Sequence, residues 1–339
     1  MRSRSSNGWF TTAMAAAFFT VAAHAGEPAP GFYKDKVLNV IVAGSPAGGH
    51  STYARLIAPF LQKHTGAREV RITNMPGGGG LKAANHVARL KPDGFNVLFG
   101  NVSTLILATI AGSPGAQFDA TKLTYLGRAT SEPRLLCVGG KSPIKTWQDV
   151  LKLGRPFVYP SQGTDEDFYT LAVIAEALGF KMKAVTGYEG NADTALAVIK
   201  GDGDGHITGL SESLAAIKAG DKRPILAIAS QRVPEFPDVP TVIEAVAPQK
   251  QQLVRAIVHI NEMHRSYIGP PAMNAGATAA FRAALNAAMN DPALVEESKK
   301  GNRPVSYMEG AKEQQVIEEI TKASAGLAPI LKAAVKDIQ

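Results

Sequence analysis

The stretch VLNVIVAGSPAGGHSTYARLIAPFLQKHTG, residues 37–66, joins an apolar run to an amphipathic segment through a loop of proline and glycine. The run VLNVIVAG predicts a buried strand. After the loop, apolar side chains recur at the spacing of a helix, at Tyr53, Leu56, Ile57, Phe60 and Leu61. A glycine at position 66 is a typical helix end. The stretch therefore predicts one unit of strand, loop and helix.

A second unit of the same kind follows directly. VRITN, residues 70–74, predicts a strand, the loop MPGGGG leads into a helix over residues 81–90, and FNVLFGN, residues 95–101, predicts a third strand. Strands that alternate with helices of this length indicate an α/β fold with parallel strands. The motifs at Pro46 and Pro76 lie thirty residues apart, about one unit. Because parallel strands deliver their following loops to one sheet edge, we expect the two loops to meet there.

The second half of the chain repeats the alternation. Further strands are expected within residues 155–163, 181–188, 206–210 and 223–229. Thr164, Asn191 and Ser211 are expected to cap the helices between them. The last ninety residues are rich in helix patterns, as in AGATAAFRAALNAAMND and EQQVIEEITKASAGLAPILKAAV. Since no long linker is evident, strands or short connections are expected to cross any domain boundary.

The first 25 residues predict a cleaved signal peptide. Arg2 and Arg4 precede a mostly apolar stretch over residues 9–23, and AHA at residues 23–25 is a typical cleavage signal. The apolar stretch is shorter than the roughly 20 residues of a membrane anchor. We therefore expect cleavage before Gly26 and a soluble, exported chain. The 314 residues that follow suffice for two domains.

Composition argues against several other classes. The net charge falls from +7 to +5 without the leader, and the basic residues are scattered, so nucleic acid is not an expected partner. Cys137 is the single cysteine, which excludes an intramolecular disulfide, and it is expected in the core. His259 and His264 are five positions apart, which misses the spacing of helical zinc sites. We expect no metal and no cofactor.

The two glycine-rich loops are the strongest functional signal. A glycine loop before a helix exposes backbone N–H groups without intrahelical partners, and the helix dipole adds partial positive charge there. Two such loops at one sheet edge predict a site for a carboxylate. The alternative is that the glycines only permit tight turns.

Two nucleotide-site motifs match these loops incompletely. GSPAGGHS, residues 44–51, fits the phosphate-loop pattern except that His50 replaces the lysine that reaches the phosphates. Gly78, Gly80 and Ala83 fit a dinucleotide fingerprint, but the next strand ends in Gly100 and Asn101 rather than in the acid that binds the ribose. Neither nucleotide class is expected.

A hydrolase would need a nucleophile on a sharp turn. The stretch GLSES, residues 209–213, lacks the second glycine of the G-x-S-x-G elbow. No catalytic residue is therefore assigned. A secreted α/β hydrolase or lyase that acts on a small carboxylated substrate stays as the alternative function.

Four stretches together resemble the substrate-binding receptors of tripartite tricarboxylate transporters, the Bug family. These stretches are AGSPAGGHSTYARLIAPFLQKHTG, VRITNMPGGGGLKAANHVARLKPDG, VTGYEGNADTALAVIKGDGDG and ILAIASQRVPEFPDVPTVIEA. The resemblance implies a two-lobed, type II-like periplasmic binding protein with a Venus-flytrap closure, each lobe a mostly parallel sheet flanked by helices. It also implies a small carboxylate ligand between the lobes and membrane permease subunits as partners.

The resemblance assigns site residues to both lobes. The first-lobe residues are Pro46, Ala47, Gly48, Gly49, His50, Ser51 and Thr52, and Pro76, Gly77, Gly78, Gly79 and Gly80 in a second loop that continues to Lys82. The second-lobe residues are Ser161, Gly163, Thr164, Asp165, Gly187 and Tyr188. In the family the glycine loops supply backbone amides and ordered waters to one carboxylate. From the residues alone, Ser51 and Ser161 are expected to donate from their hydroxyls, and Tyr188 is either a ligand contact or a core side chain.

The sequence departs from the family pattern in two places. Ser51, preceded by His50, stands where many relatives carry an aspartate, which adds a possible pH-sensitive donor. Asp165, Glu166 and Asp167 stand where relatives are rich in serine and glycine. These acids predict either a solvated first helix turn that complements the dipole, or a negative rim that disfavours a second carboxylate and welcomes an amino group.

We therefore expect a monomeric periplasmic receptor without catalysis. Its first lobe comprises residues 31–130 and 230–339, and its second lobe residues 131–229. Closure over the ligand is expected to change the surface that the transporter meets. A receptor that feeds a sensor protein instead of a transporter is an open alternative.

Overall fold

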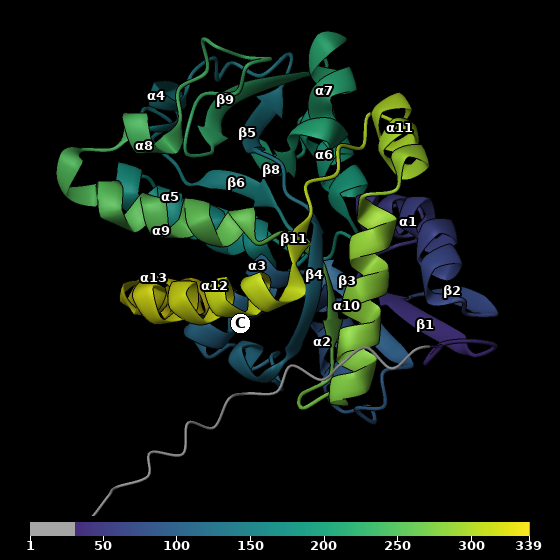
Figure 1. Ribbon diagram of the computed structural model, residues 1–339. Helices are drawn as coiled ribbons and strands as arrows, with labels where there is room; N and C mark the ends of the chain where they lie inside the picture. The colour runs from purple at the N-terminus through teal and green to yellow at the C-terminus, as the bar shows by residue number, and fades with distance from the viewer. Residues whose placement is uncertain (1–30, 339) are drawn as a thin grey trace, which may run out of the picture.

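Two groups of strands organise the computed structural model, which describes residues 31–338 (Figure 1). The predicted signal peptide lies outside the described residues. The first group is a six-stranded sheet, in the order β11-β4-β10-β3-β1-β2. Its strands are β1 (Val37–Val42), β2 (Glu69–Asn74), β3 (Asn96–Asn101), β4 (Thr124–Thr130), β10 (Arg265–Gly269) and β11 (Met308–Glu309).

The second group contains a three-stranded sheet, β8-β5-β9, and a two-stranded sheet, β6-β7. Its strands are β5 (Arg134–Gly139), β6 (Phe157–Pro160), β7 (Met182–Val185), β8 (Gly205–Gly209) and β9 (Lys222–Ile228). The backbone N–H of Asp204 donates to the Val158 carbonyl at 2.8 Å, which links the edges of β6 and β8. We call the six-stranded group the first lobe and β5–β9 the second lobe.

Strand directions correct one expectation. β1 is parallel to β2 and β3, but β10 lies antiparallel between β3 and β4, and β5 is antiparallel to both β8 and β9. β11 is antiparallel to β4, whereas β6 and β7 are parallel. The prediction of mostly parallel sheets is therefore wrong for the antiparallel pairs, whereas β1 with β2, β1 with β3 and β6 with β7 follow it. The reason is the chain path. β8 and β9 run in the same direction and are joined by a crossover helix over residues 210–218, and β5 lies between them in the opposite direction. In the same way, β10 comes from far along the chain and lies between β3 and β4, antiparallel to both.

Helices cover both lobes. The longer ones are α1 (Gly49–Thr65), α2 (Leu81–Ala88), α3 (Val102–Ala111), α5 (Glu166–Leu178), α6 (Asn191–Lys200), α7 (Leu210–Lys218), α9 (Gln251–Glu262), α10 (Ala275–Met289), α11 (Pro292–Lys300), α12 (Gly310–Ala323) and α13 (Ala328–Lys336). Two single turns are α4 (Trp147–Val150) and α8 (Val242–Ala245). Within residues 31–338, no helix combines the length and apolarity needed to span a bilayer.

The three predicted caps are each displaced by one or two residues. α5 is capped by Asp165, whose side chain accepts from the Phe168 N–H, and not by Thr164. α6 begins at Asn191, after Gly190, and α7 begins at Leu210, after Gly209. A carboxylate accepts the first-turn N–H at α5, whereas glycine leaves the other two starts without a side-chain cap.

The core lies on both faces of the six-stranded sheet. Leu38, Val40 and Val42 point to one face, where α1 and α10 cover them, and Ile41 points to the other, as strand alternation requires. The core on the second face continues into the second lobe through α3, α5 and α9. As expected, Cys137 is buried in the core, on β5.

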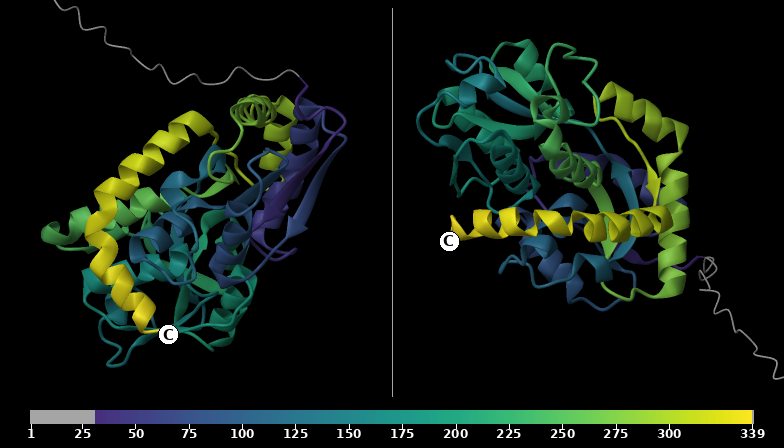
Figure 2. Two further views of the ribbon diagram at one scale, coloured as in Figure 1. Left: turned by 90° about the horizontal axis from the view of Figure 1, so that it is seen from below. Right: turned by 90° about the vertical axis from the view of Figure 1, so that its left-hand side faces the viewer.

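The carboxyl-terminal helices tie the two lobes together. α12 and α13 run as one bent rod along one side of the molecule (Figure 2). α12 packs on β4 of the first lobe, and α13 packs on α3 and on α5 of the second lobe. The sheets and helices confirm the two-lobed α/β class. The proposed residue boundaries of the lobes stay a prediction.

Candidate functional site

The first glycine loop connects β1 to α1. Gly48 precedes the helix in an extended conformation, with φ −74° and ψ 164°, and no side chain caps the helix or adds an acid to its first turn. The first backbone N–H groups of α1 therefore have no partner within the helix. The Ser51 hydroxyl donates to the Ser45 carbonyl at 2.7 Å and accepts from Asn74, and Ser51 is fully buried. Ser51 thus stabilises the loop from within, and its expected role as a ligand donor stays a prediction.

The second loop is made of four glycines between β2 and α2. Gly77, Gly78, Gly79 and Gly80 have φ values of 128°, 59°, 64° and 100°, in a region that side chains disfavour. The Asn74 amide donates to the Gly44 carbonyl at 2.8 Å, which fastens the second loop to the first. The carboxyl ends of two parallel neighbours, β1 and β2, thus bring both loops to one edge of the sheet.

A small cavity lies where these loops meet the end of β3 and the start of α3. Its volume of about 20 Å³ is enough for roughly one water molecule. The cavity is lined by Ala43, His50, Gly79, Gly80, Leu98, Gly100, Asn101, Thr104 and Leu105. Of the predicted site residues, only His50, Gly79 and Gly80 line it. This cavity is therefore too small for a ligand of several carbon atoms.

The second lobe closes directly onto both loops. A side chain at Gly79 would place its Cβ 2.7 Å from the Asp165 Cβ, and one at Gly163 would lie 3.7 Å from the backbone of Gly78. At the first loop, a Cβ at Gly49 would lie 2.1 Å from the carboxylate of Glu212 on α7. Gly79 is therefore the position where closeness between the lobes requires glycine, whereas the Glu212 carboxylate ends a flexible side chain that can move away from Gly49.

The remaining predicted residues lie around this contact without lining the cavity. Pro46, Ala47, Pro76, Gly77 and Gly78 are exposed, and Thr52 and Thr164 are half-buried. Ser161 is buried, and its hydroxyl closes its own loop by donating to the Gly163 carbonyl at 2.8 Å. Gly187 is exposed and Tyr188 is half-buried, so Tyr188 is not a core side chain.

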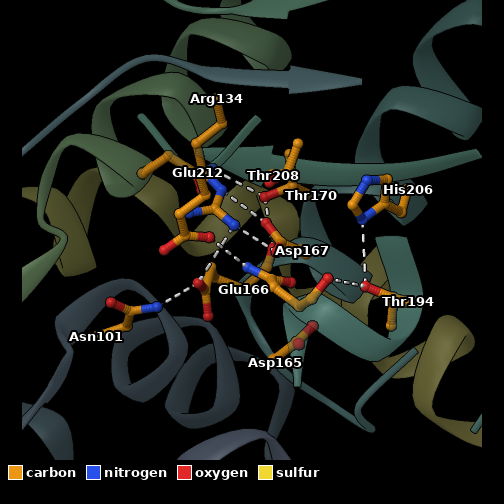
Figure 3. A network of polar contacts seen from close by, with 12 residues as sticks. Asn101, Arg134, Asp165, Glu166, Asp167, Thr170, Thr194, His206, Thr208 and Glu212 are labelled. Atoms are coloured by element: carbon orange, nitrogen blue, oxygen red, sulfur yellow. Dashed lines mark hydrogen bonds and ion pairs between the residues drawn. The ribbon is translucent and has the colours of Figure 1, made fainter. Parts of the chain in front are cut away.

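The acids at the start of α5 correct the expectation of a solvated first turn. Asp165, Glu166 and Asp167 are only 3%, 5% and 1% exposed. In Figure 3, Glu166 and Asp167 lie beside the guanidinium of Arg134, and Asp165 lies apart from it. Arg134 of β5 binds Asp167 through both guanidinium branches, with Nε 2.7 Å from Oδ1, and its Nη2 lies 3.6 Å from Glu166. Burial explains why these acids need partners from distant segments.

Glu166 reaches across to the first lobe. Its carboxylate accepts from the Asn101 amide (Figure 3). It also accepts from the hydroxyl of Thr104, at the start of α3. Sequence reasoning missed Asn101 and Thr104 as site residues. The available signal was that Asn101 ends the third strand of the same sheet edge, where ligand-contacting side chains are typical.

A second buried pair joins the lobes near the first loop. Arg265, the first residue of β10, binds Glu132 at 2.9 Å and also Glu212. Burial opposes the charge on Arg134 and Arg265, but their carboxylate partners outweigh burial and raise the pKa of both. Both guanidinium groups are therefore charged and already engaged by acids of this chain.

The pKa values of His50 and Asp165 are shifted in opposite directions. Burial, with a further contribution from Arg265, lowers the pKa of His50 to about 4. The neutral ring places Nε2 2.8 Å from the Asn101 Oδ1, an acceptor, so Nε2 carries the proton. Burial and the neighbouring charge of Glu166 raise the pKa of Asp165 to about 7. His50 is thus a neutral donor at pH 7.

The fold and the site define the class of protein: a two-lobed α/β protein in which backbone donors of the first lobe lie next to the second lobe. The structure is similar to the periplasmic binding protein BugD, with a TM-score of 0.72 and 19% identity, covering 89% of this chain and 98% of BugD. It is also similar to the malate-bound protein MatC of Rhodopseudomonas palustris, with a TM-score of 0.71 and 20% identity, covering 87% and 98%. These likenesses support the fold class.

Sequence comparison gives the family. The model of the tripartite tricarboxylate transporter family receptor matches residues 53–333, so the chain belongs to this family. It is 27% identical over 225 residues to a UPF0065 protein of Bordetella bronchiseptica, covering 63% of this chain and 64% of that protein. The match thus spans just under two-thirds of that relative's length. The family resemblance read from the sequence is confirmed.

Proposed function

We propose that the protein is a periplasmic receptor that captures a small carboxylate between its lobes and delivers it to a tripartite transporter. The observation that carries the proposal is the uncapped start of α1 beside the four-glycine loop, at one sheet edge that faces the second lobe. Two such starts offer several backbone donors to one anion, each helix end contributing about 0.3–1 kcal/mol.

The family and the fold support this function over catalysis. The family consists of receptors, and the similar protein MatC holds malate in its structure. The membrane permease subunits of a tripartite transporter are the proposed partners, and the protein is proposed to act as a monomer without chemical change of the ligand. An enzyme on the same sheet would instead convert the bound carboxylate.

A thermal-unfolding screen with mono-, di- and aminocarboxylates tests the proposal. A ligand that binds only the folded protein raises the melting temperature with its concentration. Gly48→Glu fills the start of α1 with a side chain and should remove that response. Gly326→Glu is the matched control, because Gly326 is exposed and no atom lies within 4 Å of the added Cβ.

The outcomes separate receptor from enzyme. A stoichiometric heat of binding, with the acid recovered unaltered, supports the receptor. Steady conversion of the acid by the wild-type protein supports the hydrolase or lyase. An equal melting response in wild type, Gly48→Glu and Gly326→Glu would place the binding site elsewhere.

A further inference from the structure

The carboxylate of Glu166 lies in an unusual position for a side chain of the second lobe. It leaves the first turn of α5 and binds two donors of the first lobe, the Asn101 amide and the Thr104 hydroxyl. The backbone N–H of Glu166 also donates to the Thr104 hydroxyl at 3.1 Å. Glu166 is 5% exposed and Thr104 is 2% exposed, so the contact is dry. A carboxylate of the protein itself thus sits between the lobes.

The same two donors border the cavity between the glycine loops. Asn101 and Thr104 line it together with His50, Gly79 and Gly80. A ligand whose first carboxylate meets the loops would therefore extend toward Asn101 and Thr104. In this structure their donor groups are directed at Glu166.

Within residues 31–338, the two buried guanidinium groups nearest to Glu166 and the first loop are both paired with acids of this chain. Arg134 is held by two bonds to Asp167, and Arg265 is held by Glu132 and Glu212. Asp165 lies beside Glu166 and adds another acid that burial isolates from water. Two carboxylates that share a buried site cannot both be charged without a large penalty.

We propose that Glu166 occupies the place of a second ligand carboxylate, so that the receptor selects acids with one carboxylate over dicarboxylates. This inference rests on the proposed function, because it assigns selectivity to the same crevice. Selectivity of this kind works by exclusion: the occupied donors and the negative charge act against the wrong ligand. Glu166 is thus a specificity-determining residue.

The test compares acids of equal carbon number that differ by one carboxylate: butyrate with succinate, pentanoate with glutarate, and hexanoate with adipate. Wild type should bind the monocarboxylate of the best-fitting pair more tightly. Glu166→Ala frees Asn101 and Thr104, so it should bind the matching dicarboxylate at least about tenfold more tightly than wild type does. Its affinity for the monocarboxylate should change less. Calorimetry on folded protein measures both affinities.

Three further variants make the test specific. Glu166→Gln keeps the donors occupied, so it should gain less dicarboxylate affinity than Glu166→Ala. Glu166→Ser vacates the space while keeping a polar first turn, and it replaces Glu166→Ala if that variant fails to fold. Glu176→Ala is the matched control on α5, because the Glu176 side chain is 54% exposed and pairs with Lys250. Glu176→Ala should behave as wild type.

The possible failures point to different hypotheses. Equal binding of both members of a pair by wild type, or no dicarboxylate gain in folded Glu166→Ala and Glu166→Ser, would overturn the role of Glu166 alone. A Glu166→Gln gain as large as that of Glu166→Ala would show that charge, and not occupancy, sets the preference. Absence of binding for all six acids in all variants would overturn the proposed function as well.

Discussion

The starts of α1 and α5 belong to different lobes, and they use opposite chemistry. α1 begins after Gly48 with no side-chain cap and no acid in its first turn. α5 begins after Asp165, which caps it, and continues with two more acids. The start of α1 keeps its backbone donors available, whereas at α5 the Phe168 N–H donates to Asp165 and the Glu166 N–H donates to the Thr104 hydroxyl.

This contrast explains how one crevice can attract an anion and also limit its charge. Backbone N–H groups at α1 favour one carboxylate. The buried acids at the start of α5 act against a second ligand carboxylate. Arg134 is already paired with Glu166 and Asp167, so it does not offset this repulsion. On the proposed function, selectivity is assigned to the second lobe and capture to the first. The following experiments change one side of the contrast at a time.

Removal of the cation behind α5 should have the largest effect. Arg134→Met leaves Asp167 and Glu166 buried without it, which should lower the free energy of unfolding by about 3–5 kcal/mol. Chemical denaturation measures the loss. Arg155→Met is the control on the same lobe, because Arg155 is 52% exposed in its pair with Asp204. A similarly small loss in both variants would contradict the role given to Arg134.

The second-largest effect is expected from a change at the contact between Gly79 of the first lobe and Asp165 of the second lobe. Gly79→Ala puts a methyl group against Asp165 and should weaken carboxylate binding at least about tenfold, because the lobes cannot approach fully. Gly78→Ala is the matched control, since it carries the same positive-φ cost of about 1–2 kcal/mol but meets only Leu81 at 3.8 Å. Equal affinity in the two variants would show that the contact at Gly79 is unnecessary.

The proton on Asp165 should make stability depend on pH. Because its pKa is raised from 3.8 to about 7, the folded protein holds this proton more tightly than the unfolded chain does. The contribution of Asp165 to the free energy of unfolding should therefore fall as pH rises from about 4 to about 7. Asp165→Asn keeps a capping side chain and removes the titration. The difference between wild type and this variant, measured by denaturation at each pH, isolates it.

Two groups provide the controls for this pH profile. His50, whose pKa is lowered to about 4, changes stability with the opposite sign, but it is present in both proteins and cancels in the difference. Asp119 also caps a helix, and its pKa is lowered through hydrogen bonds to Thr121, despite an opposing effect of burial. Asp119→Asn should thus give a flat difference above about pH 5. A flat curve for Asp165→Asn as well would refute the shift.

The smallest effect is expected from a cap added to α1. Gly48→Ser makes its start resemble a capped helix and should stabilise the fold by only a few tenths of a kcal/mol, because serine and glycine differ little at this position. The new hydroxyl competes for the donors of α1, so carboxylate affinity should fall a few-fold. Unfolding and binding measured on one sample should therefore change in opposite directions. Tighter binding would argue against free donors at α1.

Local patterns predicted much of this architecture. The strand, loop and helix units at residues 37–66 and 70–101, and the meeting of their loops, follow from apolar spacing and parallel neighbours close in sequence. The position of β10 between β3 and β4 could not be predicted from such local patterns. Tyr267 pairs with Phe99, from a segment far away along the chain, and no local signal encodes such a pairing.

The acids of α5 mark the limit of sequence reasoning most clearly. Three consecutive acids at a helix start favour a solvated turn when only neighbouring residues are considered. Their burial depends on Arg134, Asn101 and Thr104, which come from other elements and supply a charge and two donors. Burial of a charge is tolerated only where such partners meet it.

The amino-acid order was thus sufficient for the α/β class, the glycine loops and the family. Each of these is visible in short stretches of sequence, as apolar spacing, turn residues or motifs. Which donors stay free and which are taken by the protein's own carboxylates depends on how the two lobes pack. The free energy of a buried polar group is set by partners that the fold brings from far along the chain.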